Sequence, residues 1–547
     1  MNKRFFVTLT VAFAFCGLST VYAQEKVISG QVRIGSETAE GVDVIVSGTD
    51  RGTSTDSSGM YSISVNVGET IEYQYIGYRL ETRTVEPSTN VINVNLIEDD
   101  STLEEIVILA YGQQRSKNEV TGNVVQISGE EISKAPMVSA DQALQGKVAG
   151  LSMATNSGTP GSTQQIRIRG MNSINASNDP LIVVDGVPLT NFNLTGDSAS
   201  ASSLSALSSI NSNDIESITV LKDAGATSVY GARGANGVIL ITTKRGRKGG
   251  TQYEFVSSLG VQNNAIKGPR SLTGQEKFDL LLEAYNNTYN GGGPFNSEGV
   301  YNQLIDQFPG ETEGLQEWVN RGRPVNNWSD YMLNKDALIS ILNLSATGGD
   351  EKTTYFASLG YNKTEGTVIG SDFRRVSGTF SFDRKLSDKI DFGFNVNLSN
   401  IKQNGILEQG AFFSNPNLIR YFMSPWNSPY NADGSYNLDR SKLSGLHNPL
   451  YTIPNNIKYN DVIRVINNNR LGYSITDDLK FTTQLSTDYS YVFYRNYNNP
   501  VHGDGFAYNG YAENSSAQMF KYTSQNSLDY RFYLGDNHRF DAKVLME

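Results

Sequence analysis

The chain has 547 residues, of which 38% are hydrophobic and 18% are charged, and its mean hydropathy is −0.36. This composition can form a hydrophobic core, but it is too polar for a bundle of membrane helices and too poor in charge for a disordered polyelectrolyte. The net charge of −11 argues against nucleic acid as a partner, because phosphate binding needs a basic surface.

Residues 1–23 are predicted to be an export signal peptide. A basic start precedes an apolar stretch from Phe5 to about Leu18, and small residues up to Ala23 provide a cleavage pattern. The apolar stretch is too short for a membrane anchor, so we expect the mature chain to begin at Gln24. The single cysteine, Cys16, lies inside this segment. The mature chain is therefore expected to lack disulfides, thiolate metal sites and cysteine nucleophiles.

Residues 24–100 are predicted to form a small β-sandwich. Apolar residues alternate with polar ones in two runs, 61–67 and 92–96, and turn-forming residues at 47–50 and 56–59 lie between strand candidates. The stretch resembles the carboxypeptidase regulatory-like domain, including the hairpin "GTSTDSSGMYSI". No cluster of zinc ligands accompanies it, so no protease activity is expected.

Residues 113–247 are predicted to form a second unit that mixes helix and strand. A short helix is expected at 139–148. The strand candidates are 165–169, Leu181–Val184, Ile215–Leu221 and Val238–Thr243. The last two are nearly continuous apolar runs, which is typical of strands that are buried on both faces.

Residues 248–547 show strict alternation with a period of two. In the clearest run, 390–399, Phe392 and Phe394 alternate with Gly393 and Asn395, and similar runs occur at 355–362, 376–383 and 479–489. We expect strands of about ten residues, which is the length of a tilted transmembrane β-strand.

The connections between these strands alternate between short and long. Tight turns are predicted at 348–351, 386–389, 475–478 and 534–537, and longer loops at about 263–336, 365–372, 403–459 and 493–515. Short turns on one side and long loops on the other are typical of an outer-membrane β-barrel and less so of a soluble sandwich. In the first long loop, Thr273 and Glu276 predict a capping box at the start of a helix.

Five segments in the middle of the chain occur in a specific order. They are "LEEIVILAYG", "LQGKVAGL", "IRIRG", "PLIVVDGVP" and "IESITVLKDAGATSVYGARGANGVILITTKRG". Together they resemble the SusC/RagA family of TonB-dependent outer-membrane transporters, and the resemblance extends over the chain from about residue 25. It implies a mainly β protein with an accessory sandwich, a Ton box, a plug at 113–247 and the first part of a large antiparallel barrel. It also implies import of an oligosaccharide or a peptide through the outer-membrane lipid, with a SusD-like surface lipoprotein as a lid.

Residues 101–112 are predicted to be a linker followed by the Ton box. A short apolar run after an acidic linker can add as a strand to the exposed sheet edge of a partner. The resemblance implies that this partner is the C-terminal domain of TonB, which is energised by ExbB and ExbD. The alternative is an ordinary strand of the plug. The predicted Ton box consists of Glu105, Ile106, Val107, Ile108, Leu109 and Ala110.

The plug region contains glycines and charges that need an interpretation. No Gly-Lys-Ser/Thr follows the glycines, so we expect tight turns near the barrel wall rather than a nucleotide site. The charged residues are expected to pair with one another or with the inner wall, because unpaired buried charges are costly. The glycines are Gly225, Gly231, Gly234 and Gly237, and the charged residues are Arg167, Arg169, Arg233 and Asp185.

No catalytic residues, metal site or cofactor are expected. The three histidines are far apart in the sequence and lack ligand spacing, and no G-x-S-x-G motif is present. Aromatic side chains in the long loops are candidates for stacking on sugar rings, although aromatic girdles at a membrane interface are a competing explanation. The candidate substrate-binding residues are Trp318, Trp328, Trp426 and Tyr430.

Two other functions remain open from the sequence, a passive outer-membrane porin and a surface receptor that signals to a regulator. We also expect the barrel segment to be incomplete. About nine strands are counted from residue 251, the ninth beginning at Arg539, whereas bacterial barrels of this type close with an even number.

Overall fold

The computed structural model describes residues 25–547, apart from 36, 50, 76–77, 98–105, 109–113, 117–122, 135–136, 156, 176, 190–193, 195–203, 267–269, 406–414 and 536–537. The predicted signal peptide lies outside the described residues. The chain divides into two compact units, 1–106 and 107–547. Within the described ranges, no helix combines the length and the apolar character that crossing a membrane requires.

The first unit is a β-sandwich, as predicted. In β5 (Met60–Asn66), Tyr61, Ile63 and Val65 are buried while the residues between them are exposed, so the alternation of the sequence divides core from solvent. The buried Tyr61 hydroxyl donates to the Ile92 carbonyl over 2.8 Å. One sheet consists of β2 (Glu37–Thr38), β1 (Glu25–Ile34), β5 (Met60–Asn66) and β8 (Val94–Leu96), and the other of β4 (Gly52–Ser54), β3 (Asp43–Val46), β6 (Thr70–Gln74) and β7 (Glu81–Thr84).

The plug begins the second unit and contains the four predicted strands. Its main sheet has the order β11 (Val124–Ser128), β16 (Ile215–Leu221), β17 (Val238–Thr243), β14 (Leu181–Val184) and β15 (Val187–Pro188). A separate hairpin pairs β12 (Leu151–Thr155) with β13 (Gln164–Ile168), and the plug also contains α1 (Gly129–Ser133) and α2 (Ala224–Thr227). β16 and β17 are almost wholly buried, which confirms the prediction that these apolar runs are strands buried on both faces.

The helix predicted at 139–148 is wrong in its length and type. Only Ala140–Leu144 is helical, and it is a 3₁₀ turn. Gly146 adopts a φ of 74°, in the left-handed region, which an α-helix cannot continue through.

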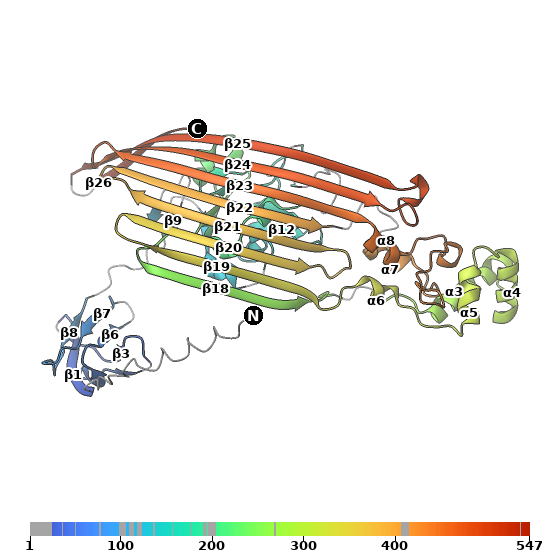
Figure 1. Cartoon of the computed structure of the whole chain (residues 1–547), viewed down its shortest axis with the longest axis horizontal. Coiled ribbons are helices and arrows are strands. Elements are labelled where there is room, and N and C mark those ends of the chain that lie inside the picture. Colours follow the sequence, from blue (N-terminus) through green and yellow to red (C-terminus); the bar gives the residue numbers. More distant parts are fainter. Residues whose placement is uncertain are drawn as a thin grey trace, which may run out of the picture. The chain divides into compact units, whose positions relative to one another are not determined.

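The rest of the second unit is built on one antiparallel sheet, which has nine strands in the described part of the chain and in which each strand pairs with the next in sequence (Figure 1). Its strands are β18 (Gly249–Gln262), β19 (Ala337–Gly349), β20 (Thr353–Glu365), β21 (Asp372–Lys385), β22 (Ile390–Asn404), β23 (Ile457–Ser474), β24 (Leu479–Asn498), β25 (Tyr511–Leu534) and β26 (His538–Met546). The alternation of short turns and long loops is as predicted.

Except for β26, these strands are longer than the expected ten residues. β25 has 24 residues, and its first part, which lacks apolar alternation, still pairs with β24. Backbone hydrogen bonds therefore continue the sheet beyond the segment that the side-chain pattern marks.

The two faces of the sheet differ in polarity in the opposite sense to a protein that folds in water. In β19, Leu342 and Leu344 are exposed, whereas Asn343 and Ser345 between them are buried. In β21, Phe380 is 41% exposed and the neighbouring Ser381 is fully buried. The exposed face is thus apolar, and the polar face is covered.

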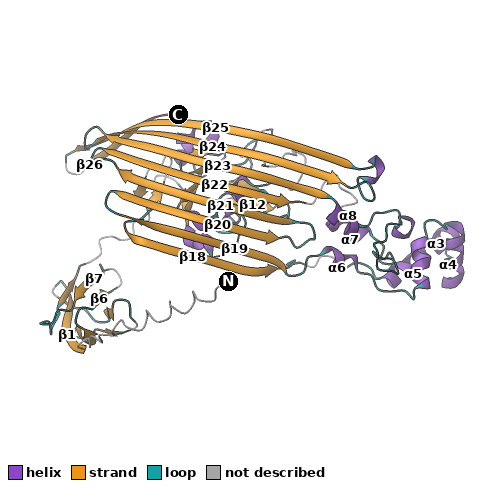
Figure 2. Cartoon of the chain, in the orientation of Figure 1, coloured by secondary structure: helices purple, strands orange, loops and turns teal. Residues whose placement is uncertain are grey.

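Short helices occupy two of the long loops and lie toward one end of the strands (Figure 2). The predicted capping box is present at α3, where Thr273 Oγ1 accepts from the Glu276 N–H at 3.2 Å and Glu276 Oε2 accepts from the Thr273 N–H at 2.8 Å. The helices are α3 (Gly274–Tyr289), α4 (Ser297–Gln307), α5 (Glu313–Asn320) and α6 (Trp328–Met332) in the first loop, and α7 (Pro416–Phe422) and α8 (Pro449–Asn455) in the loop before β23.

Candidate functional site

The plug covers the polar face of the sheet, and Arg375 of β21 is central to this contact. Its side chain is 2% exposed, and Nη1 donates to the carbonyls of Val138 at 3.1 Å, Ser208 at 2.8 Å and Ile210 at 2.8 Å. All three carbonyls belong to the plug. Because a guanidinium has only donors, its burial requires such acceptors, and Arg375 ties two plug segments to one strand.

A plug carboxylate makes the reciprocal contact. Asp214 precedes β16 and is 1% exposed, and its Oδ2 accepts from the Ser358 hydroxyl at 2.6 Å and the Thr379 hydroxyl at 2.8 Å. Burial raises the pKa of Asp214, and these two hydrogen bonds oppose the shift. The carboxylate thus joins the plug to both β20 and β21.

An ion pair between two strands of the nine-stranded sheet, here called the wall, also reaches the plug. Arg464 of β23 and Asp488 of β24 form two parallel hydrogen bonds, at 3.0 and 2.8 Å, and both side chains are almost fully buried. Arg464 Nη1 also donates to the plug carbonyl of Ala206 at 3.1 Å. The bidentate geometry satisfies the carboxylate and leaves one guanidinium edge for the plug.

A small apolar patch lies within this largely polar interface. Phe373 of β21 and Ile401 of β22 are fully buried against the plug residue Leu204, which is also fully buried. The other members are Val138, Leu194, Ala206, Val462 and Val492. The patch lies near the long-loop ends of the strands, because Phe373 is next to the first residue of β21 and Ile401 is close to the last residue of β22.

The plug charges singled out in the sequence have partners other than one another. Arg167 forms an ion pair with Asp179, and Arg169 with Asp223, both within the plug. Arg233 pairs with Glu547, which directly follows β26 of the sheet. The two carboxylates within the plug were not identified by sequence reasoning, since they lie in turns without a distinctive pattern. Asp185, the fourth of these charged residues, accepts hydrogen bonds from the N–H of Thr243 at 3.0 Å and from the hydroxyl of Thr243 at 2.7 Å.

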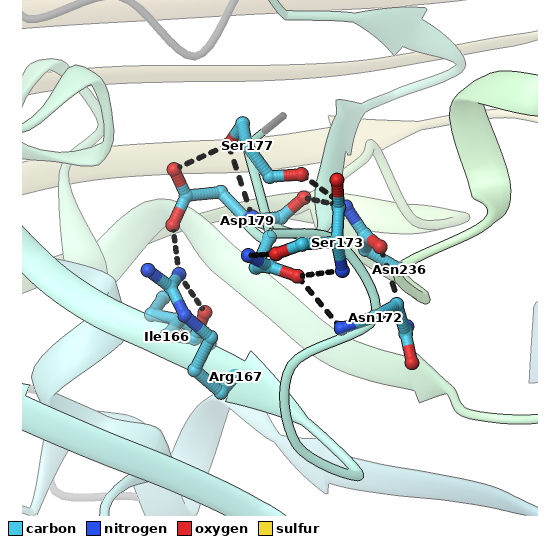
Figure 3. A network of polar contacts seen from close by, with 8 residues as sticks. Ile166, Arg167, Asn172, Ser173, Ser177, Asp179 and Asn236 are labelled. Atoms are coloured by element: carbon cyan, nitrogen blue, oxygen red, sulfur yellow. Dashed lines mark hydrogen bonds and ion pairs between the residues drawn. The ribbon is translucent and has the colours of Figure 1, made fainter. Parts of the chain in front are cut away.

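The Arg167 pair belongs to a polar network that shapes the loop between β13 and β14 (Figure 3). Asn178 Oδ1 accepts from the N–H groups of Asn172 and Ser173, at 2.7 and 2.8 Å. Asn236 Nδ2 donates to the Ser177 carbonyl at 2.8 Å, which ties the loop to the start of β17. The hydrogen bonds fix a loop on which Met171 and Ile174 are 80% and 100% exposed.

Two of the plug-region glycines are required by their surroundings. Gly237 has a φ of 90°, and a Cβ there would lie 2.7 Å from Ile168. The predicted close approach to the wall is made instead by Gly246, where a Cβ would lie 2.2 Å from the Tyr355 nitrogen of β20. Gly237 therefore shapes a turn within the plug, whereas Gly246, which follows β17, brings the chain against the sheet.

The Ton box is only partly within the described residues. Its centre forms β9 (Ile106–Ile108), which is hydrogen-bonded to β10 (Gln114–Ser116) in a two-stranded sheet. Glu105, Leu109 and Ala110 lie outside the described residues. The segment has the backbone of a strand, and its role in binding TonB stays a prediction.

The three tryptophans predicted to bind substrate lie in hydrophobic clusters formed by residues of the long loops. Trp318 and Trp328 are each 2% exposed, and their indole N–H groups donate to the carbonyls of Pro324 at 2.8 Å and Asn427 at 3.1 Å. Trp426 is 9% exposed, beneath the ammonium group of Lys277. These contacts support a structural role, and a binding role stays a prediction.

Tyr430, the fourth candidate, lies in an exposed hairpin of residues 429–437, here called the tyrosine hairpin. Tyr430 and Tyr436 form a β-bridge and stack with ring centroids 5.6 Å apart, and they are 38% and 40% exposed. The Asn437 N–H donates to the Pro429 carbonyl at 2.9 Å and closes the hairpin. Sequence reasoning missed Tyr436, although the turn Asn-Ala-Asp-Gly between two tyrosines could have indicated the pair.

No group of three or more His, Cys, Asp or Glu side chains in the described ranges could hold a metal ion.

Comparisons with known proteins identify the class to which these features belong. Residues 116–238 match the TonB-dependent Receptor Plug Domain, and residues 28–108 match the CarboxypepD_reg-like domain. The chain thus carries a CarboxypepD_reg-like domain followed by a plug domain of the TonB-dependent receptor type.

The chain is also similar over most of its length to individual TonB-dependent receptors. The chain is 34% identical to TonB-dependent receptor P26 of Formosa agariphila over 96% of this chain and 49% of the relative. It is 34% identical to TonB-dependent receptor SusC of Bacteroides thetaiotaomicron over 78% of this chain and 39% of the relative. The chain therefore spans about half the length, or less, of the curated relatives it matches.

The fold has a counterpart among solved structures. The RagAB peptide importer in the open-open state aligns with a TM-score of 0.66 at 23% identity, over 80% of this chain and 48% of that chain. These findings confirm the resemblance to the SusC/RagA TonB-dependent receptors, together with the mainly β fold that it implied.

Proposed function

We propose that the protein imports a nutrient across the outer membrane by TonB-dependent active transport. The observation that carries this proposal is the inverted sheet, whose apolar face is exposed and whose polar face is occupied by the plug. An exposed apolar face suits contact with outer-membrane lipid, and a polar inner face suits a water-filled passage once the plug has moved.

The chemistry of the plug interface supports movement. Arg375 and Arg464 of the sheet donate to plug carbonyls, and Asp214 of the plug accepts from hydroxyls of the sheet. Each such bond to a charged group contributes about 1.5–3 kcal/mol net, because water replaces the partner when the surfaces separate. A pulling force can then exchange these contacts for water one after another, whereas a large apolar interface would resist separation as a whole.

The predicted Ton box provides the place for that force. β9 belongs to an isolated two-stranded sheet, and such a pair is only marginally stable by itself. TonB, energised by ExbB and ExbD, can therefore add a strand to β9 or replace β10 at little cost.

The tyrosine hairpin is the proposed first contact for cargo, which is an oligosaccharide or a peptide. Two half-exposed rings with phenolic hydroxyls can stack on a sugar ring or an aromatic side chain and also form hydrogen bonds. A SusD-like lipoprotein as a lid belongs to the same proposal, and its support is the similarity to SusC and the RagAB importer.

Deleting residues 105–110 in the protein as its own cell produces it tests the proposal. Energised uptake of labelled cargo should be lost and surface binding retained, and deletion of TonB should give the same result. A matched deletion within the linker, residues 98–102, should keep most of the uptake. Uptake that survives both the 105–110 deletion and the loss of TonB would favour a passive porin and contradict the proposal.

A further inference from the structure

Two long loops, in which residues 415–456 and 499–510 are described, meet at a pair of buried histidines. His447 and His502 are 3% and 2% exposed, and their Nδ1 atoms lie 3.2 Å apart. The rings meet edge to face, with centroids 4.4 Å apart. Sequence reasoning set both residues aside because they are 55 positions apart and lack ligand spacing.

The neighbouring backbone groups determine which nitrogen carries each proton. The Asn448 N–H donates to His502 Nε2 at 2.6 Å, so Nε2 is the bare nitrogen and His502 carries its proton on Nδ1. That proton points to His447 Nδ1, which also accepts from the Gly503 N–H at 2.9 Å. His447 therefore carries its proton on Nε2, and the pair is arranged for two neutral rings.

The histidine pair is connected to the tyrosine hairpin through one residue. Asn448 is fully buried, and its side-chain Nδ2 donates to the carbonyls of Pro429 at 2.8 Å and Asn437 at 3.0 Å. These carbonyls belong to the two ends of the hairpin. The N–H of Asn448 that contacts His502 and the amide that holds both ends of the hairpin thus belong to the same residue.

The charged groups that face the pair are Arg440 and Asp504. Burial holds the pKa of His447 at about 4, with Arg440 adding to the shift and Asp504 opposing it. Burial also holds the pKa of His502 at about 4, with further lowering by His447 and Arg440. The Tyr451 ring, of α8, packs against His502 at 6.0 Å.

We propose that His447 and His502 are positioning residues for the tyrosine hairpin, and that a proton added to the pair releases the hairpin from the adjacent loop. A proton on His502 Nε2 removes the acceptor of the Asn448 N–H, and a proton on His447 Nδ1 removes the acceptor of both the His502 and Gly503 donors. Either one breaks the connection between the loops. The inference rests on the proposed binding function only for its effect on cargo, because the coupling is a property of the loops.

The direction of the pH dependence follows from the lowered pKa values. The buried, neutral pair favours the joined loops fully above the ordinary histidine pKa of 6.5, and this contribution is lost as the pH falls through that value toward 4. For one proton, the ratio of separated to joined loops should rise about 30-fold between pH 8 and pH 5.

Hydrogen–deuterium exchange without cargo, on the protein purified from its own outer membrane, tests the coupling directly. At pH 7.5, His502→Ala should raise exchange in residues 429–437 by about tenfold or more, because the anchor of the hairpin is lost. The double variant His447→Asn/His502→Gln places amide oxygens near the former His447 Nδ1 and His502 Nε2, so neither position can titrate. This variant should keep nearly normal exchange at pH 7.5 and lose most of the acid response, after correction for the intrinsic pH dependence of exchange.

The exposed His538 supplies the matched control, since His538→Ala should leave residues 429–437 unchanged. Unchanged exchange in the hairpin of His502→Ala, or an acid response of the double variant equal to that of the parent, would overturn the inference. Binding of labelled cargo to Tyr436→Ala is measured separately. Unchanged binding there would remove the role of the hairpin in binding, while a coupling seen by exchange would still support the inference.

Discussion

The N-terminal β-sandwich and the nine-stranded sheet alternate polar and apolar side chains in the same way, but they bury opposite halves of the pattern. In β5, Ile63 and Val65 are buried and the serines beside them are exposed. In β19, Asn343 and Ser345 are buried and the leucines beside them are exposed. Period-two alternation therefore predicts a strand with two different faces, but it does not tell which face is covered.

The environment of each strand explains the difference. An apolar face in water is covered by a second sheet, as in the sandwich, because burial of apolar surface is the main stabilising term. A face that contacts lipid gains nothing from being covered, so the polar face collects the protein contacts instead. Three predictions test this contrast, in order of decreasing effect.

The largest effect is expected at the ion pair of the wall. Arg464→Met leaves the Asp488 carboxylate buried without its bidentate partner and should lower stability by about 3–5 kcal/mol. The double variant Arg464→Met/Asp488→Leu should recover most of the loss. The measurement is thermal unfolding of the protein purified from its membrane, and a double variant no more stable than the single one would argue against an unpaired charge as the cause.

The second prediction compares the exposed faces of the two regions. Leu344→Arg places a charge near the middle of the apolar face and should cost about 2–4 kcal/mol if that face contacts lipid. Ser62→Arg, on the exposed face of β5, is the matched control and should change stability by less than about 0.5 kcal/mol. Equal effects of the two substitutions on thermal unfolding would remove the contrast.

The smallest effect concerns a polar group in the apolar core. The Thr55 hydroxyl of the sandwich accepts from the Val42 N–H at 2.9 Å and donates to the Ala39 carbonyl at 2.7 Å. Thr55→Val should cost about 1–3 kcal/mol, because both backbone groups lose their partner. Local hydrogen exchange at residues 39–42 should rise, and unchanged exchange would show that water replaces the hydroxyl.

Much of the fold was predictable, since strands and turns depend on neighbours in sequence. The runs at 390–399 and 376–383, the turns between them and the cap of α3 all follow from local patterns. The ends of the strands were not predictable in this way. Pairing between β24 and β25 continues through polar residues that carry no alternation.

The candidate site was predictable only in part, because its contacts join distant residues. Arg375 binds carbonyls more than 160 positions earlier in the chain, and any carbonyl can serve as an acceptor. The loop tryptophans have the same appearance in sequence whether a ring lies in a core or stacks on a ligand. Only the structure distinguishes the buried Trp328 from the half-exposed Tyr430.

The most direct test of the central claim is the environment of four consecutive residues of β19. Single cysteines at positions 342, 343, 344 and 345, carrying spin labels in the protein in native-like bilayers, report contact with lipid-dissolved oxygen or with a water-soluble relaxing agent. The inverted sheet predicts strong oxygen contact at Leu342 and Leu344, and little contact with either agent at the plug-covered Asn343 and Ser345. Strong contact with the water-soluble agent at Leu342 and Leu344 would contradict a lipid-facing sheet and, with it, the proposed transporter.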